Sequence, residues 1–466
     1  MNAQNIVDAS PTKRFFVEML TRDIELEDAI LDLLDNCVDG MIRTNAERGG
    51  AKASREYEKF KASIDFDTGK FELSDNCGGI PRDVATKYAF IMGRRKGDHR
   101  DEDIPTIGVY GIGMKRAIFK MGKEARVDSR RADDAFHVSI TPQWMQEDGV
   151  ASWTLPLGEG AEIKTPGTRI KVTQLNSEVM QAFNSKESPF EEDLRGKIAA
   201  HYAIIIEKGF QVTVNGKPVR AEPLLLLSNP RLGMAPFMYD ADLGGVNVQL
   251  TVGLYDTTAD DDDDDDDDES ATSQRSRARS GWTIVCNDRV VVLCDKTRLT
   301  GWGEATVPNF HPQYIGIAGI VHFRSNTALL LPINTTKRGI EAGSDLYLQV
   351  KDHMRAGTKL FTDYTNRWKK QAHEEREVRR GATAASPDEI RKQIDAKDWT
   401  KVRGKTNEKR YQPKLPEPKN TTEDVIVRFT KPAVKVKRLA KLLLDDPNAS
   451  ASAVGSLAFD MALKSK

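Results

Sequence analysis

Acidic and amide side chains cluster in residues 29–40, and their spacing is the first in this sequence that suggests chemistry. Apolar residues recur at three- and four-residue intervals there, which predicts an amphipathic helix. On that helix Asp32 and Asn36 share one face, while Asp35 and Asp39 form a second pair on a neighbouring stripe. An amide beside a carboxylate suits Mg²⁺, which takes oxygen ligands and shares phosphate oxygens. The alternative is a solvated acidic helix face.

A second candidate is the turn at residues 73–81, which a predicted strand enters. Asp75 leads into Gly78 and Gly79, and glycines let the backbone approach a ligand closely. A buried acceptor such as Asp75 can take the exocyclic amine of adenine. The alternative is an ordinary Asp-Asn-Gly turn.

The third candidate is the glycine-rich stretch at residues 108–119. Its glycines stop at Gly113, where helix-forming residues begin, so backbone N–H groups and the positive end of a helix dipole converge. Lys115 in the first turn opposes that dipole unless it faces an anion. The spacing fits neither the Walker A nor the Rossmann pattern. It predicts a phosphate-binding helix start of another kind.

In this order and at these separations, the three motifs resemble the ATP-binding boxes of the GHKL superfamily. That superfamily includes gyrase B, the ninety-kilodalton heat-shock chaperone, histidine kinases, MutL and the MORC ATPases. A fourth match, residues 166–170, is similar to the late Gly-Thr strand of the family. The resemblance implies a Bergerat-type α/β sandwich, in which a mixed, mainly antiparallel sheet carries helices on one face. ATP is then held between the helices and a lid.

The resemblance also implies roles for individual residues. Asn36 would ligate a Mg²⁺ ion that bridges the phosphates, and Asp75 would bind adenine together with Thr168 through water. The other residues implied to contact the nucleotide are Asp39, Gly79, Ile80, Gly108, Tyr110, Gly111, Ile112, Gly113, Met114 and Lys115, and Gly93 would begin the lid.

Two positions depart from the family pattern. Asp32 stands where hydrolysing members carry a glutamate that acts as general base, and aspartate reaches roughly 1.5 Å less far. Since a misplacement of about 1 Å can cost on the order of a hundredfold in rate, we expect slow hydrolysis. Cys77 replaces the first glycine of the adenine turn.

A second domain is expected to supply a cation to the same site. Residues 331–339 resemble the lysine loop of the transducer domain in gyrase B, topoisomerase VI and MutL, which implies that Lys337 reaches the γ-phosphate as a catalytic residue. A basic surface turn is the alternative. Residues 281–290 resemble a strand–turn–strand of the same domain, and Asn287-Asp288 is a good hairpin turn.

The predicted fold class is therefore α+β, with three regions. Residues 1–180 form the ATP-binding domain, 181–370 a transducer-like α+β domain, and 371–466 a basic linker with a short helical C-terminal region. An aspartate-rich insertion at 257–280 is expected to be disordered, and its run Asp260 to Asp268 is either a solvated loop or an electrostatic decoy for a basic surface. Strands are predicted at 62–66, 70–74, 125–128, 136–140, 168–172, 211–214, 246–255, 282–293 and 316–323, and later helices at 190–208, 344–370, 434–444 and 453–463.

Composition limits the class of protein. The chain has 466 residues, 39% of them hydrophobic, and 69 basic residues balance 70 acidic ones, which excludes a simple polycation for nucleic acid. Four cysteines without a CxxC pair are expected to be reduced thiols. No window has the ~20 apolar residues of a membrane span. We therefore expect a cytoplasmic protein without a membrane partner.

The expected function is Mg²⁺-dependent ATP hydrolysis that drives a clamp-like conformational switch. The resemblance implies an ATP-dependent homodimer formed through residues 1–22, acting with DNA or a DNA-acting protein in DNA transactions or in a bacterial-type defence or repair system. The alternatives are a non-hydrolysing ATP-gated binding module, a protein kinase and a chaperone on the same nucleotide fold.

Overall fold

The computed structural model describes residues 12–47, 49, 56–94, 101–108, 110–147, 153–184, 188–222, 224–255, 279–334, 337–369, 371–418 and 430–464. The chain divides into two compact units, Met1–Glu417 and Pro418–Lys466. Residues 1–11 of the expected dimerisation segment and the aspartate run lie outside the described residues.

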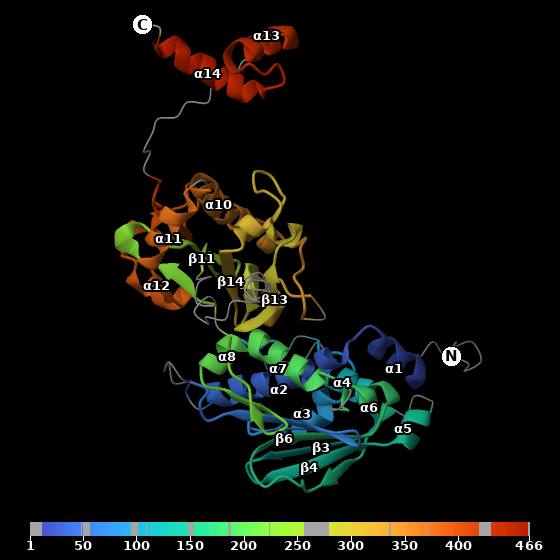
Figure 1. The fold of residues 1–466 in the computed structure, drawn as a ribbon. Coiled ribbons are helices and arrows are strands. Elements are labelled where there is room, and N and C mark those ends of the chain that lie inside the picture. Colours follow the sequence, from blue (N-terminus) through green and yellow to red (C-terminus); the bar gives the residue numbers. More distant parts are fainter. Residues whose placement is uncertain are drawn as a thin grey trace, which may run out of the picture. The chain divides into compact units, whose positions relative to one another are not determined.

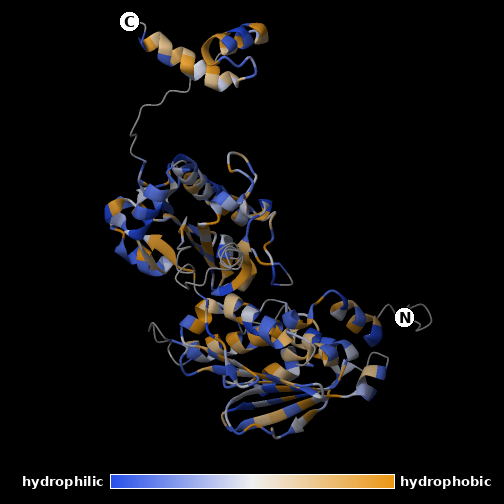
Figure 2. Cartoon of the chain, in the orientation of Figure 1, coloured by the Kyte–Doolittle hydropathy of each residue, from blue (hydrophilic) through white to orange (hydrophobic). Residues whose placement is uncertain are grey.

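The larger unit contains two large sheets, and the first has eight strands in the order β5-β4-β3-β6-β2-β1-β7-β8. Its neighbouring strands are antiparallel except for the parallel pair β1 and β7. Alternate residues of β1 are buried, as in a sheet with one covered face, and Figure 2 shows the same alternation of hydrophobic and hydrophilic residues along the strands. The strands are β1 (Lys61–Phe66), β2 (Lys70–Asp75), β3 (Gly122–Arg131), β4 (Asp134–Ile140), β5 (Leu157–Glu159), β6 (Gly167–Leu175), β7 (Gln211–Val214) and β8 (Lys217–Pro218).

Helices cover one face of this sheet, and Figure 1 shows α2, α4 and α7 on the same side of β3, β4 and β6. The longest of them, α2, buries Ile30, Leu33 and Val38 in the core between helices and sheet, so the predicted periodicity is confirmed. The helices are α1 (Lys13–Arg22), α2 (Leu26–Glu47), α3 (Arg82–Val84), α4 (Gly113–Met121), α5 (Pro142–Gln146), α6 (Ser177–Ala182), α7 (Phe190–His201) and α8 (Ala203–Glu207).

The second sheet has seven strands in the order β13-β12-β14-β11-β10-β17-β16, in which β12 and β14 are parallel. The long helix α10 (Asp345–Trp368) buries Tyr347, Met354 and Phe361 in the core of this sheet. The strands are β10 (Phe237–Leu243), β11 (Val246–Leu254), β12 (Gly281–Cys286), β13 (Arg289–Asp295), β14 (Ile317–Arg324), β16 (Thr400–Lys401) and β17 (Glu408–Tyr411). The remaining elements are β9 (Leu226–Ser228), β15 (Thr383–Ala385), α11 (Ala372–Arg380) and α12 (Pro387–Gln393).

The predicted α+β class is confirmed, but two expected regions share elements with their neighbours. Strand β7 lies in the sequence range predicted for the second domain, but it pairs with β1 and belongs to the first sheet. Strands β16 and β17 fall in the expected linker and complete the second sheet. Sequence pattern hides β17 because Lys409 and Arg410, both exposed, occupy its centre, as is common near sheet edges.

The smaller unit contains the two helices that the sequence predicts near the C-terminus. They are α13 (Ala433–Leu444) and α14 (Ala451–Lys464), and they bury only Ala440 and Val454. All four cysteines are free thiols, as expected. Within the described ranges, no helix combines the length and the apolar character needed to cross a bilayer.

Candidate functional site

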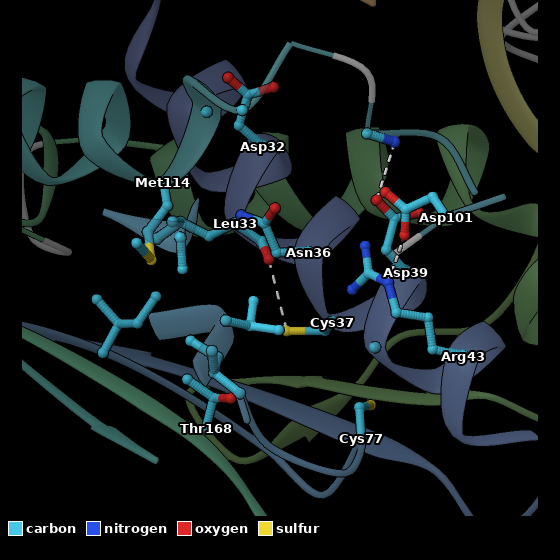
Figure 3. Close-up of a pocket in the computed structure, with 18 of the residues that line it drawn as sticks. Asp32, Leu33, Asn36, Cys37, Asp39, Arg43, Cys77, Asp101, Met114 and Thr168 are labelled. Atoms are coloured by element: carbon cyan, nitrogen blue, oxygen red, sulfur yellow. Dashed lines mark hydrogen bonds and ion pairs between the residues drawn. The ribbon is translucent and has the colours of Figure 1, made fainter. Parts of the chain in front are cut away.

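A cavity of about 690 Å³ opens between helix α2, the turn after β2, the start of α4 and strand β6. Figure 3 shows Asp32 and Asn36 on α2, with Met114 and Thr168 on other walls of the same pocket. The predicted site residues that line it are Asp32, Asn36, Asp39, Asp75, Gly79, Ile80, Gly108, Tyr110, Gly111, Ile112, Gly113, Met114, Lys115, Thr168 and Lys337. Five segments that are distant in the sequence therefore meet at one cavity.

Gly93 is the predicted site residue that does not line the cavity. Its φ is +89°, and a Cβ placed on Gly111 would lie 3.3 Å from its carbonyl oxygen. Gly93 therefore lies beside Gly111 but outside the cavity lining.

On the part of helix α2 that lines the cavity, one side chain is exposed and its neighbours are buried. Between Ala29 and Asp39, every residue is buried except Asn36, which is exposed and lines the cavity. Asp32, Asp35 and Asp39 are 1–3% exposed. The alternative of a solvated acidic face is therefore wrong, because buried carboxylates need partners.

Both carboxylate oxygens of Asp39 accept hydrogen bonds from the backbone at the start of the glycine-rich stretch. The backbone N–H groups of Ile107 and Gly108 donate to its two oxygens at 2.7 and 2.8 Å. Burial raises the pKa of Asp39 in spite of these bonds and of nearby Arg43. In this structure Asp39 fixes the cavity wall.

One end of the cavity suits a planar, amine-bearing base. Asp75, at the end of β2, accepts hydrogen bonds from the backbone N–H of Cys77 at 2.7 Å and of Thr168 at 3.3 Å, and the Cys37 thiol donates at 3.5 Å. Burial raises the pKa of Asp75 to about 6, although these bonds favour the charged form. Apolar side chains line the same cavity as this carboxyl, namely Leu33, Leu73, Ile80, Met114 and Ile170.

The turn after β2 depends on glycine for packing as well as for access. Gly79 has a φ of +75°, and a Cβ there would clash with the carbonyl oxygen of Arg130 on β3. Cys77, the departure from the family pattern, is buried and its carbonyl accepts from the Thr44 hydroxyl at 2.8 Å. The cysteine is accommodated because Gly78 and Gly79 supply the positive φ angles.

The other end of the cavity suits an anion. Helix α4 begins here, its N-cap Ile112 offers no side-chain acceptor, and its first turn contains no acidic residue. The N–H groups of a first helical turn have no partner within the helix, so they are free to bind phosphate oxygens. Lys115 is 4% exposed, and its ammonium donates to the carbonyl oxygens of Ala89, at 2.9 Å, and Gly111. It thus ties the glycine-rich stretch to the segment before it.

Arg116, for which the sequence pattern suggests no role, pairs with Asp32. The guanidinium donates to Oδ2 of Asp32, and both side chains line the cavity. Its Nε is buried and finds no acceptor among the described residues. A cavity-lining guanidinium with an unused donor fits an anionic ligand.

Lys337 lies in the loop between strand β14 of the second sheet and helix α10, and it lines the cavity of the first domain. Its ammonium lies 3.1 Å from Oδ2 of Asp35, whose other oxygen pairs with Arg289 at 3.0 Å and accepts from the Tyr202 hydroxyl at 2.7 Å. Burial alone would raise the pKa of Asp35, but Lys337 and Arg289 lower it to about 2. This buried cluster was not predicted in the sequence analysis.

Arg43, Arg94 and Asp101 form another charged cluster that lines the cavity. Asp101 pairs with Arg43 of α2 at 2.6 Å and with Arg94 at 2.7 Å. Arg43 stands four residues after Asp39, so helical spacing could have placed it on this side of α2. Among the described residues, no group of three His, Cys, Asp or Glu side chains is arranged to hold a metal ion by itself.

No protein-family model and no curated protein sequence matches this chain.

Proposed function

We propose that this chain is a Mg²⁺-dependent ATP-binding and ATP-hydrolysing protein of the GHKL type, built on a Bergerat fold. The observation that carries the proposal is the single cavity on which Asn36, Asp75 and Gly113 converge from three separate segments. One end offers a carboxyl in an apolar setting, and the other an uncapped helix start beside cations. A carboxyl in an apolar setting suits adenine, and a helix start beside cations suits the triphosphate.

The residues present fit a nucleotide-bound magnesium ion. Asn36, the exposed side chain on this part of α2, would supply an oxygen ligand, and a metal held by one amide would take its remaining ligands from phosphates and water. When bound, Mg²⁺ supplies charge neutralisation of the phosphates. The first turn of α4 then orients the phosphate chain through its N–H groups.

Asp32 is the proposed general base that takes a proton from the attacking water. Its carboxylate lies one helical turn from Asn36, and a Cβ on Gly113 would lie 3.3 Å from its Cβ, so it sits against the helix start. The pair with Arg116 orients this carboxylate and also occupies one of its oxygens. We therefore expect slow turnover.

The second sheet makes the proposed enzyme a switch. Lys337 lies in the loop between β14 and α10, so a ligand that binds its ammonium favours the arrangement in which this loop contacts α2. We further propose an ATP-dependent homodimer that acts with DNA or a DNA-acting protein. The support for DNA is the basic character of the chain after residue 371.

One observation favours a second candidate, a binding module gated by ATP without hydrolysis. Because Arg116 pairs directly with Asp32, that carboxylate is already neutralised by a cation. In that case the cavity binds Mg·ATP and releases it unchanged.

Binding and turnover measured on the same variants test the proposal. We expect Mg·ATP to bind the wild type and Asp32→Asn alike, and phosphate release to disappear only in Asp32→Asn. Asn36→Ala should lose the Mg²⁺ dependence of binding. Asp352→Asn, a 67%-exposed carboxylate on α10, is the matched control. Binding without phosphate release in the wild type would favour the gated module, and no binding would refute both candidates.

A further inference from the structure

We propose that Asp35 is the positioning residue that holds Lys337 at the cavity wall and gives it up to the terminal phosphate of the nucleotide. This inference rests on the proposed function and adds the device by which the site tells a triphosphate from a diphosphate. Asp35 itself does not touch the nucleotide in this scheme, because its side chain is 1% exposed and does not line the cavity.

The two cations on Asp35 differ in how firmly they are held. Arg289 is 3% exposed, its Nε lies 3.0 Å from Oδ1, and its guanidinium stacks over the ring of Tyr202 at 4.5 Å. Lys337 is 11% exposed, lies 3.1 Å from Oδ2 of the carboxylate, and lines the cavity, whereas Arg289 does not line it. Arg289 is therefore the fixed partner of Asp35, and Lys337 is the exchangeable one.

The loop that carries Lys337 is anchored on both sides of this residue. Ile333 and Ile340 form an antiparallel bridge, and the Lys337 N–H donates to the carbonyl oxygen of Asn334 at 3.0 Å. Arg338 pairs with Asp28, two turns before Asp35 on α2. Lys337 can therefore change its partner while the loop stays attached to the same helix.

Lys337 is also held in an unfavourable backbone conformation. Its φ is +58°, in the left-handed region that non-glycine residues avoid. Such strain persists where the surroundings impose it, and it is concentrated at ligand clamps and switches. The ion pair with Asp35 is one of the contacts that impose it here.

A terminal phosphate competes with Asp35 because it carries more negative charge than one carboxylate. Asp32 and Asp39 also act electrostatically on Lys337, so the ammonium stays near the cavity when Asp35 releases it. A diphosphate that ends short of Lys337 does not compete. The cost of breaking the Lys337–Asp35 pair is thus subtracted from ATP binding and not from ADP binding.

A double-mutant cycle on the full chain tests this, with the ratio of ATP to ADP affinity as the readout. Asp35→Asn should raise the ratio by about tenfold, because Lys337 loses its competing partner. Lys337→Met should bring the ratio close to one. In the Lys337→Met background, Asp35→Asn should leave the ratio unchanged.

Two outcomes would overturn the inference: a ratio that falls in Asp35→Asn, or one that rises equally with and without Lys337. Asp35→Asn leaves Arg289 buried without a counter-charge and is prone to unfold. Asp35→Asn/Arg289→Gln removes both charges, and the same rise is expected there. Failure of ATP and ADP to bind the wild type would refute the proposed function instead, whereas binding of both with no effect of Asp35 on their ratio would refute this inference alone.

Discussion

Four aspartates along helix α2 each bind a different partner. Asp28, Asp32, Asp35 and Asp39 follow each other at four-, three- and four-residue spacing, which keeps them on one side of the helix. Asp28 pairs with Arg338, Asp32 with Arg116 and Asp35 with Lys337, while Asp39 holds backbone N–H groups. Because a buried carboxylate without a partner is costly, these pairs fix three segments to α2: the start of α4, the loop of Lys337 and Arg338, and the start of the glycine-rich stretch.

At the residue scale, Asp75 predicts a pH dependence of nucleotide binding. Its pKa of about 6 means that the carboxyl becomes protonated below that pH and no longer accepts freely from an amine. ATP affinity should therefore fall by up to tenfold per pH unit below about 6 and level off above it. Titrations of the wild type between pH 5 and 8 measure this, and Asp75→Asn should bind weakly without the step.

The same group acts on stability in the opposite direction. The native state holds the Asp75 proton between the ordinary carboxyl pKa of 3.8 and about 6, where the unfolded chain has lost it. The contribution of Asp75 to the free energy of unfolding therefore decreases as pH rises through this window and stays constant above it. Urea unfolding of wild type and Asp75→Asn separates this slope from that of Asp39. An identical slope in both proteins would show that Asp75 does not titrate there.

At the element scale, the sequence pattern predicted the two helices whose formation depends on residues close together in the chain. The periodicity around Leu33 predicted α2, and the end of the glycines predicted the start of α4 at Gly113. The partners of Asp35 lie 167 to 302 residues away, at Tyr202, Arg289 and Lys337. Long-range pairing of this kind leaves no periodic trace, so only the resemblance pointed to Lys337 and nothing pointed to Tyr202 or Arg289.

The start of α4 yields a prediction in which stability and binding move apart. Ile112→Asp places a negative charge at the uncapped helix start, where it interacts favourably with the N–H groups by about 0.3–1 kcal/mol. The same charge repels a phosphate chain, so ATP affinity should fall by about tenfold or more. Thermal unfolding and ATP titration of one sample measure both effects.

Ile112→Asn is the matched control, because it has the same shape without the charge. It should keep the stability of the wild type within about 0.5 kcal/mol and lose much less affinity. Equal losses of affinity in the two variants would place the phosphate chain away from this helix.

At the scale of the whole larger unit, hydrogen bonds join the second sheet to the cavity. Asn287, in the turn between β12 and β13, donates to the carbonyl oxygen of Thr106 at 2.9 Å and to that of Ser325 at 3.0 Å. Ile107 follows Thr106 directly, and its backbone N–H donates to the carboxylate of Asp39 on α2. A turn of the second sheet therefore holds the start of the glycine-rich stretch in place.

Asn287→Ala should weaken stability and nucleotide binding together. It leaves buried carbonyl groups without a donor and puts alanine at a φ of +46°, which together should cost about 2–4 kcal/mol. Because the carbonyl of Thr106 loses its hydrogen bond to the second sheet, ATP affinity should also fall. Affinity is measured well below the midpoint of thermal unfolding, so that the variant is folded. Asn287→Gly tolerates the positive φ, so it should be about 1 kcal/mol more stable than Asn287→Ala, with the same loss of affinity. Both variants lack the amide, so unchanged affinity in either one would mean that the second sheet reaches the nucleotide only through Lys337.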